Sequence, residues 1–289
     1  MNSHELALTY LGTNTLLIRK GDTALLVDPH FSRPSLMGLI KRIQPDVGQV
    51  KQCLVIAGVS RLDGVLLTHT HYDHAMDAPE AAKKTGATIF GSSSAANLAV
   101  AAGLDQNRIH VVAPGEPYPV GSFLIIFHPA EHLPFPRPLR WLLPPDMGIT
   151  NKHSTPSFFW HYACGETYAI QIDRVLIFGS AGFSPGAYSG LDIEHVVLSI
   201  GGLETRPQAY LEQLYQQTVI DSGAGQVWLS HWDNFFRPLN KPMVYLGKSA
   251  DNIQRINEIG TDYGQSVKTL PFNQPLVLTR SAKITRTFT

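Results

Sequence analysis

The feature that most constrains this chain is a cluster of metal-binding side chains directly after an apolar run. Four such side chains, His69, His71, Asp73 and His74, fall within six residues. The run before them, Gly64-Val65-Leu66-Leu67, is typical of a buried strand. The cluster therefore lies at the carboxyl end of that strand, where open α/β sheets form their ligand crevices. The sequence predicts an α/β fold with a metal site at this strand end.

The spacing within the cluster suits two ions. His69 and His71 are two residues apart, so in extended backbone both imidazoles point the same way and can reach one ion. Asp73 and His74 come later and can turn toward a second ion. The alternative is that these residues are scattered surface polar groups, or a helix start capped by Asp73. We favour the metal site, because three histidines and a carboxylate behind an apolar strand have no packing rationale.

The rest of the chain alternates between strand and helix patterns, which favours α/β architecture. Residues 29–61 and the proline-dense stretch 134–145 predict two long loops, the first of them a lid that could contain a short helical excursion. No linker or repeat interrupts the pattern, so we expect a single domain over residues 1–289. The predicted strands are 6–11, 15–18, 23–27, 64–67, 109–112, 123–127, 157–161, 167–172, 175–178, 196–200 and 227–229, the first three as an antiparallel meander; the predicted helices are 77–84, one beginning near Pro207, and one from Ser249 as N-cap to near Gly264.

Composition narrows the classes of partner. The chain has 289 residues with 23 basic and 23 acidic side chains, and only 16% of its residues are charged. This balance excludes disorder driven by excess charge and gives no electrostatic attraction to nucleic acid, which we do not expect as a partner. Two cysteines are too few for a disulfide framework. No signal peptide or transmembrane run is recognisable, so we expect a cytoplasmic protein.

The histidine cluster also carries a family resemblance. His69-Thr70-His71-Tyr72-Asp73-His74 resembles the His-x-His-x-Asp-His signature of the metallo-β-lactamase superfamily. The resemblance implies a four-layer αβ/βα sandwich of two mixed β-sheets flanked by helices. Residues 8–14 and 26–29, and above all Asp28-Pro29-His30-Phe31-Ser32-Arg33-Pro34, are similar to the branch containing ascorbate-6-phosphate lactonase and N-acyl-phosphatidylethanolamine-hydrolysing phospholipase D.

The resemblance also implies a set of metal ligands. His69 and His71 would share the first ion with His132, which lies in a Pro-Ala-x-His segment at 129–132. His128, four residues earlier, is the alternative to His132. Asp73 and His74 would share the second ion with His231, which follows another apolar run.

The chain departs from the family at one position. The family usually has an aspartate that bridges both ions, and here Ser180 stands in its place. Because a hydroxyl is a poorer bridging ligand than a carboxylate, we expect the second site to bind more weakly or to stay empty. Asp28 would orient a histidine ligand through its second ring nitrogen. The resemblance also places the loops of His30 and His153 around the site mouth, so both are candidates for substrate binding.

These residues imply a hydrolase. A zinc ion in such a site lowers the pKa of its water from about 15.7 toward about 7, which gives a metal-bound hydroxide as nucleophile. Manganese or iron is an alternative metal. Asp73 is the candidate catalytic base if the second ion is absent. We expect a small-molecule ester, lactone or phosphodiester as substrate.

Two apolar stretches, 36–40 and 139–143, suit a substrate with an apolar portion, or else pack on the sandwich or form a homo-oligomer contact. The alternative function, suggested by Ser180, is a non-catalytic or weakly active metal-binding sandwich that binds a ligand without turnover.

Overall fold

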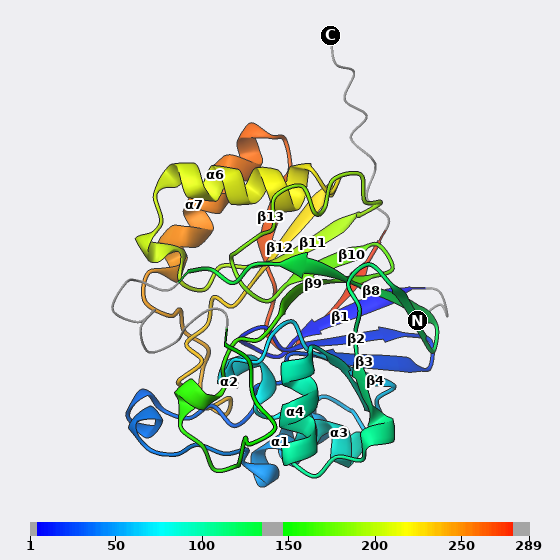
Figure 1. Ribbon diagram of the computed structural model, residues 1–289. Coiled ribbons are helices and arrows are strands. Elements are labelled where there is room, and N and C mark those ends of the chain that lie inside the picture. The colour runs from blue at the N-terminus through cyan, green and yellow to red at the C-terminus, as the bar shows by residue number, and fades with distance from the viewer. Residues whose placement is uncertain (1–4, 135–146, 280–289) are drawn as a thin grey trace.

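Two seven-stranded sheets stack against each other with helices on their outer faces (Figure 1). The computed structural model describes residues 5–134 and 147–279. In Figure 1, helices α1, α3 and α4 cover the first sheet from below, and α6 and α7 cover the second sheet from above. The four layers are those of the αβ/βα sandwich, so the predicted fold class is confirmed.

The first sheet has the order β14-β1-β2-β3-β4-β5-β6. The strands from β14 to β3 pair antiparallel, and those from β3 to β6 pair parallel. The expected meander is therefore confirmed, and the C-terminal strand β14 returns to its edge. The bounds are β1 (Leu6–Tyr10), β2 (Leu16–Lys20), β3 (Thr23–Val27), β4 (Gly64–Leu66), β5 (Thr88–Gly91), β6 (Ile109–Val111) and β14 (Pro275–Leu278).

The second sheet has the order β13-β12-β11-β10-β9-β8-β7 and repeats the mixed design. Its strands from β10 to β13 pair parallel, and those from β7 to β10 pair antiparallel. The bounds are β7 (Pro117–Val120), β8 (Phe123–Ala130), β9 (Thr167–Ile172), β10 (Val175–Phe178), β11 (His195–Ser199), β12 (Gln226–Ser230) and β13 (Ser266–Thr269).

Helices and short helical turns connect these strands. Helix α3 ends at Gly86, whose φ of 82° lies in the left-handed region that glycine adopts most readily. The described helices are α1 (Val47–Ile56), α2 (Tyr72–Ala75), α3 (Ala78–Thr85), α4 (Ser93–Ala101), α6 (Gln208–Tyr215) and α7 (Ser249–Asp262), and the short turns are η1 (Leu36–Ile40), η2 (Gln106–Arg108), η3 (Phe159–His161), η4 (Leu203–Thr205) and η5 (Gln216–Ile220). None of the helices in the described ranges is long and apolar enough to cross a membrane.

Three apolar cores hold the layers together. The central core lies between the sheets and takes side chains from both, such as Leu25 and Val27 of β3 and Ile125 and Phe127 of β8. The two outer cores lie between each sheet and its helices. Because apolar side chains fill the interior, a functional site can form only at an edge of the sandwich.

Three sequence expectations need correction. Ser249 is not the N-cap of α7 but its first residue, and Lys248 occupies the N-cap position. Residues 29–61 are not a plain loop: η1 is the short helical excursion that we expected, but α1 adds ten helical residues. Asp46 caps α1 by accepting a hydrogen bond from Gln49 N at 2.9 Å. The apolar pattern of α1 is weak, since Val55 and Ile56 are exposed. The predicted strand at 157–161 is wrong, because Ser157 forms only an isolated bridge with Ile43 and the chain then turns into η3. The loop predicted at 134–145 lies outside the described residues apart from Pro134.

Candidate metal centre

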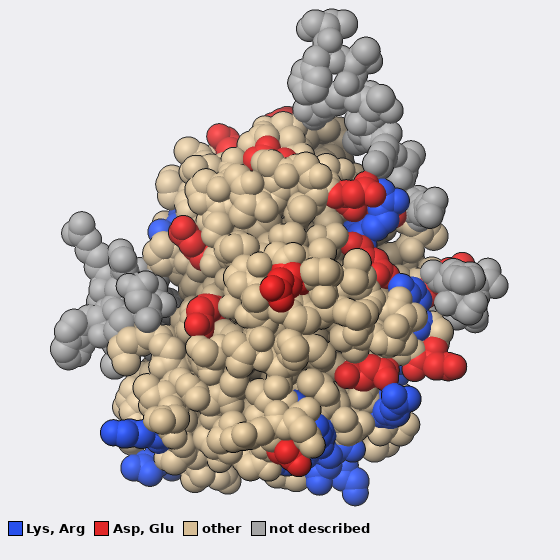
Figure 2. Space-filling model, turned by 45° about the vertical axis from the view of Figure 1, so that its right-hand side comes forward, with Lys and Arg blue, Asp and Glu red and all other residues tan. Residues whose placement is uncertain are grey.

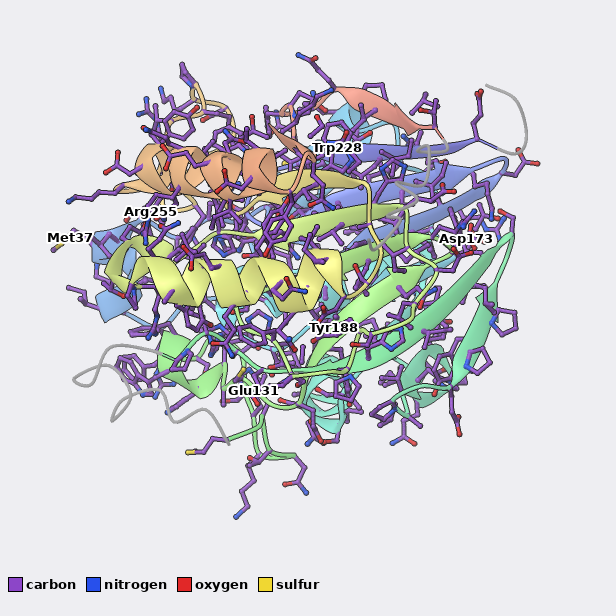
Figure 3. The ribbon with its side chains drawn as sticks, turned by 90° about the horizontal axis from the view of Figure 1, so that it is seen from above. Met37, Glu131, Asp173, Tyr188, Trp228 and Arg255 are labelled. Carbon is purple, nitrogen blue, oxygen red and sulfur yellow. The ribbon has the colours of Figure 1, made fainter. Side chains whose placement is uncertain are left out.

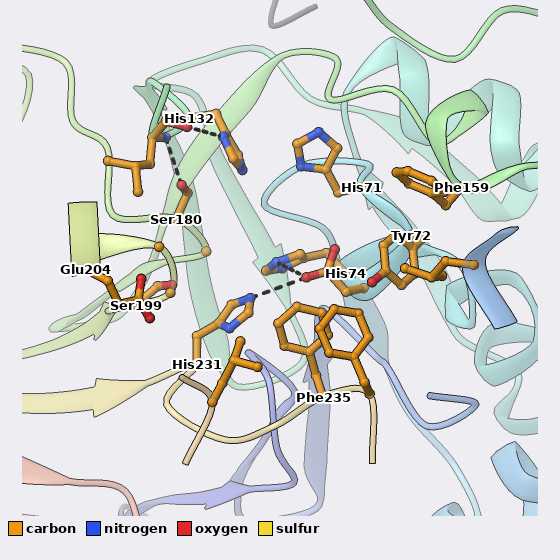
Figure 4. A pocket seen from close by; sticks show the side chains of 18 of the residues that line it. His71, Tyr72, His74, His132, Phe159, Ser180, Ser199, Glu204, His231 and Phe235 are labelled. Atoms are coloured by element: carbon orange, nitrogen blue, oxygen red, sulfur yellow. Dashed lines mark hydrogen bonds and ion pairs between the residues drawn. The ribbon is translucent and has the colours of Figure 1, made fainter. Parts of the chain in front are cut away.

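Strand ends from both sheets meet at one edge of the sandwich and carry the predicted metal ligands. His69, His71, Asp73 and His74 follow β4 of the first sheet. His132 follows β8 and His231 follows β12, both of the second sheet. Figure 4 shows that the labelled His71, His74, His132 and His231 surround one cavity. Three distant segments of the chain thus bring their imidazoles together.

The first cluster consists of His69, His71 and His132. One ring nitrogen from each lies within 4.8 Å of the other two. The ring centroids are 4.8 Å apart for His69 and His71, and 4.6 Å apart for His71 and His132. His132 Nδ1 lies 2.8 Å from the carbonyl oxygen of Leu133, which leaves Nε2 as its ligand atom. This is the set that the resemblance implied for the first ion.

The protonation state of the first cluster suits a cation. Burial, together with the neighbouring histidines, holds the pKa of His69 and His71 well below the ordinary value. Burial also lowers the pKa of His132, to about 4. All three rings are therefore neutral at pH 7, as metal ligation requires. His69 Nε2 is buried without a hydrogen-bond partner in the described chain, and such an atom is costly unless a ligand satisfies it.

The second cluster consists of Asp73, His74 and His231. Their ligand atoms also lie within 4.8 Å of one another. One carboxylate oxygen of Asp73 lies 3.3 Å from His231 Nε2 and 3.7 Å from His74 Nε2. His231 has a left-handed backbone, with φ of 58°, and its N–H donates to the Thr13 carbonyl at 2.6 Å. The backbone of the first meander therefore helps to hold this histidine.

Charges within the second cluster attract a cation. Burial alone would raise the pKa of Asp73, but His74 and His231 outweigh it and hold that pKa well below the ordinary value. Asp73 is therefore ionised, which suits a ligand better than a strong base. Burial alone would lower the pKa of His74, but the Asp73 and Asp28 carboxylates outweigh it and raise that pKa. A bound cation would compete with this proton.

Asp28 lies behind both clusters and contacts their ligands from outside. Its carboxylate lies 2.9 Å from His74 Nδ1 and accepts the Thr68 hydroxyl at 2.6 Å. The same hydroxyl lies 3.0 Å from His69 Nδ1, so its oxygen can accept a hydrogen bond from the N–H of that ring. The Asn14 amide and the Thr68 N–H complete the contacts, each at 2.8 Å. These bonds orient the rings of His69 and His74 toward the cavity, which is the kind of contact that tunes a metal ligand.

Ser180 is the residue that we expect at the position of the family's bridging aspartate. It follows β10 and lines the cavity, with 7% of its surface exposed. Its hydroxyl oxygen accepts the Leu133 N–H at 2.9 Å, which fixes the backbone next to His132 (Figure 4). At this position of the cavity wall, Ser180 thus supplies a neutral hydroxyl that is already engaged as an acceptor, and no carboxylate.

A buried network that the sequence did not single out supports His231. Asp233 accepts hydrogen bonds from the Tyr10 hydroxyl at 2.5 Å and from Thr13 N at 2.6 Å. Arg33 Nη1 lies 2.8 Å from the other carboxylate oxygen. Burial alone would raise the pKa of Asp233, but Arg33 and Tyr10 outweigh it and lower that pKa. Only the position of Asp233 two residues after His231 could have drawn attention to it.

The cavity beside the clusters is apolar over most of its wall. Its volume is about 520 Å³. Tyr72 and Phe159 lie on one side and Ser180, Ser199 and Glu204 on the opposite side (Figure 4). The apolar side chains that line it are Leu36, Leu39, Tyr72, Leu133, Phe159, Phe235, Phe236 and Leu246. Such a cavity has the size and polarity of a small-molecule site.

Three other histidines do not line this cavity. His128, the alternative to His132, lies on β8 with Nε2 2.8 Å from the Gln171 side chain. His30 is fully buried between Tyr72 and Phe235, with both ring nitrogens unpartnered in the described chain. His153 packs against the ring of Tyr162, with centroids 4.9 Å apart. The structure therefore places neither substrate-binding candidate, His30 or His153, at the cavity wall.

Comparisons with known sequences identify the family of this chain. The model of the metallo-beta-lactamase superfamily matches residues 8–221. A curated relative named UPF0173 metal-dependent hydrolase, from Christiangramia forsetii, is 36% identical over 90 residues. That match covers 31% of this chain and 34% of the relative. The chain therefore spans about a third of the length of this relative.

Solved structures share the fold at low sequence identity. Igni18, a metallo hydrolase from Ignicoccus hospitalis, aligns with a TM-score of 0.57 and 17% identity over 96% of this chain and 100% of its own. YhfI from Bacillus subtilis, a protein with the metallo-beta-lactamase fold, aligns with a TM-score of 0.53 and 17% identity over 94% of this chain and 99% of its own. At such identity the likeness concerns the architecture alone.

Proposed function

Because this chain belongs to the metallo-beta-lactamase superfamily, we propose that it is a metal-dependent hydrolase of small molecules. The observation that carries the proposal is the meeting of His69, His71 and His132 within 4.8 Å at the wall of a cavity. Neutral imidazoles from separate segments have no packing reason to converge there. They provide instead the donor set of a catalytic metal site.

We assign the first ion to His69, His71 and His132, and a weaker second ion to Asp73, His74 and His231. A divalent metal bound there would lower the pKa of a coordinated water and polarise the bond under attack. Asp28 holds the ring of His74, and through Thr68 that of His69. Asp73 would act as a ligand or, without a second ion, as the proton acceptor. Zinc suits this donor set best, with manganese or iron as alternatives.

The substrate in this proposal is an ester, lactone or phosphodiester with an apolar portion. Leu36, Leu39, Phe235 and Phe236 provide the apolar wall for that portion. They also exclude water from the reacting group, which strengthens electrostatic interactions in the cavity. Cytoplasmic location stays part of the proposal, and the two free, buried cysteines, Cys53 and Cys164, are consistent with a reducing compartment.

The test compares the metal-loaded protein with its His71→Ala variant. Both are loaded with zinc, manganese or iron and assayed on ester, lactone and phosphodiester substrates. We expect hydrolysis of at least one class to fall by about 100-fold or more in the variant, because a ligand is lost. Equal rates in the two proteins on every substrate class would remove the proposal. His128→Ala serves as the matched control, since that histidine lies outside the cavity.

A second candidate function is binding without turnover. It is favoured by Ser180, which gives the two clusters no shared carboxylate. In that case the first cluster would bind metal, but neither the unmodified protein nor His71→Ala would hydrolyse any of the substrates. His71→Ala would still lower the metal content. Measuring metal content beside the rates separates the two functions.

A further inference from the structure

One wall of the cavity is polar, and neither metal cluster uses it. Ser199 ends β11, and Glu204 lies on η4, which follows closely in the chain. Both line the cavity, on the side opposite Tyr72 and Phe159 (Figure 4). The pair is therefore placed to contact a bound molecule at a distance from the apolar wall.

Ser199 has an unsatisfied hydroxyl. Its residue is 1% exposed, and its Oγ has no hydrogen-bond partner in the described chain. Along β11 it shares a face with Val197, which belongs to the core between the sheets, so its side chain points to the inner side where the cavity opens. A buried hydroxyl without a partner is unfavourable by about 1–3 kcal/mol. A ligand group at this position would relieve that cost.

Glu204 is a carboxylate without a cation. It forms no hydrogen bond or ion pair within the described residues, and it is only partly exposed. A methyl group added to Gly247 would lie 3.7 Å from Glu204 Oε1, so the carboxylate lies beside the loop at 246–247. The nearby Arg206 is engaged elsewhere: its guanidinium donates to the Pro134 carbonyl and lies 5.5 Å from the ring of Tyr210.

Among the described residues, the rest of the wall supplies no Lys or Arg side chain to balance this carboxylate. Apart from the histidines of the two clusters, the cavity lining within the described chain contains neither Lys nor Arg. Charged side chains are also sparse on the outer face seen in Figure 2. A carboxylate in an apolar cavity favours a cationic partner and disfavours an anion.

We propose that Ser199 and Glu204 bind a protonated amino group of the substrate, with Glu204 determining specificity. This rests on the proposed function and narrows it: the substrate is an amine-bearing ester or lactone with an apolar body, rather than a phosphodiester. The amino group donates to the Glu204 carboxylate and to Ser199 Oγ. Its apolar body lies along Phe235 and Phe236, and the bond to be cleaved faces the histidine clusters.

The test uses three matched probes of one shape: 3-phenylpropylamine, 3-phenylpropanol and 3-phenylpropanoate. Their binding is measured by calorimetry on the metal-loaded protein and on the protein after chelator treatment. The second measurement removes direct contact between a probe and a metal ion. In both states we expect the amine to bind about tenfold more tightly than the alcohol, which is the order of a charge-assisted hydrogen bond. The carboxylate probe should bind most weakly in the chelator-treated protein.

Two variants test whether the preference for the amine over the alcohol depends on Ser199 and Glu204. Glu204→Gln keeps the shape of the side chain and should abolish the tenfold preference while leaving alcohol binding unchanged. Ser199→Ala should weaken both the amine and the alcohol. The matched control is Glu212→Gln, which removes the same charge from the exposed face of α6 and should leave all three affinities unchanged.

The proposal is overturned if the amine and alcohol bind the unmodified protein equally, or if the preference persists in Glu204→Gln. These outcomes are separable from failure of the hydrolase proposal, because binding in the chelator-treated protein needs no turnover. A preference that depends on Glu204, in a protein that hydrolyses nothing, would support the amine site and reject the enzyme.

Discussion

Arg33 and Asp233 form an ion pair in the interior, with 2.8 Å between Arg33 Nη1 and a carboxylate oxygen of Asp233 and side chains that are 1% and 0% exposed. The pair joins the loop after β3 of the first sheet to the loop after β12 of the second. Gly12 makes room for it, because a methyl group there would lie 1.9 Å from Arg33 Nη2. Since Asp233 also holds Thr13 N, and Thr13 holds the backbone of His231, the pair belongs to the support of the second cluster.

Removing one partner of this pair should destabilise the protein strongly. In Asp233→Ala, the Arg33 guanidinium stays buried without a counter-ion, and we expect a loss of about 3–5 kcal/mol in the free energy of unfolding. Urea denaturation measures this change. The matched control is Glu80→Gln, which breaks the more exposed pair with Lys83 and should cost less than about 1 kcal/mol. A loss of similar size in both variants would contradict the importance of the buried pair.

Asp28→Asn should weaken metal binding without removing a ligand. The amide would present a donor or a weaker acceptor to His74 Nδ1 and to the Thr68 hydroxyl, and so release the orientation of His74 and His69. Changes of this kind cost about 10–100-fold in metal affinity. Competition with a chromophoric chelator measures the affinity. Asp46→Asn, at the exposed start of α1, is the control; equal affinities for both variants would reject the orienting role of Asp28.

Ser180→Asp should strengthen the second site. A carboxylate at this position of the cavity wall would add a negative charge and a metal-binding oxygen next to the His132–Leu133 backbone, and the family resemblance implies that it would bridge both ions. We expect the number of ions bound per chain to rise, or the weaker of two affinities to increase, in elemental analysis and titration. Ser180→Asn matches the volume without the charge and should leave the stoichiometry unchanged. If Ser180→Asp binds no more metal than Ser180→Asn, the missing carboxylate is not what limits the second site.

Burial of His195 should make the stability of the fold depend on pH. Burial lowers the pKa of this ring, whose Nε2 lies 3.0 Å from the Thr279 carbonyl at the end of β14. Because the pKa is lower in the folded than in the unfolded state, the unfolded state binds more protons, and stability falls as the pH drops through about 6.5. We expect the free energy of unfolding to decrease less between pH 7.5 and pH 5 in His195→Gln than in the unmodified protein. Identical pH profiles would contradict this.

The local sequence was sufficient for four of the candidate metal ligands and for most strands. His69, His71, Asp73 and His74 share one short segment, so their proximity follows from chain continuity. The distant His132 and His231 were predicted only through the family resemblance, because no local pattern connects them to the cluster.

The sequence was insufficient where tertiary contacts decide the structure. Helix α1 lacks a strong apolar stripe, and its start depends on the Asp46 cap. The aromatic run at 157–161 has strand-like composition, but η3 turns Phe159 toward the cavity instead of into a sheet. The ion pair of Arg33 with Asp233 joins residues 200 positions apart, and no pattern along the chain indicates such a pair.

The orientation of the side chains in η1 was also beyond the sequence pattern. Leu39 lines the cavity and is 8% exposed, whereas Met37 is 71% exposed and points away from the body of the molecule at the edge of the view in Figure 3. Residues two positions apart in one short turn thus face different environments, which a short apolar run cannot distinguish.

Each cluster draws two of its side chains from the loop after β4 and the remaining one from the opposite sheet. An ion held by such a set would crosslink the two sheets, because its ligands come from both of them. The ion would bind only when both sheets are packed together. Its binding free energy would therefore add to the free energy of unfolding. Stripping the ion should therefore lower the melting temperature, and β4, β8 and β12, the strands that precede the clustered side chains, should lose more amide-exchange protection than strands far from the site.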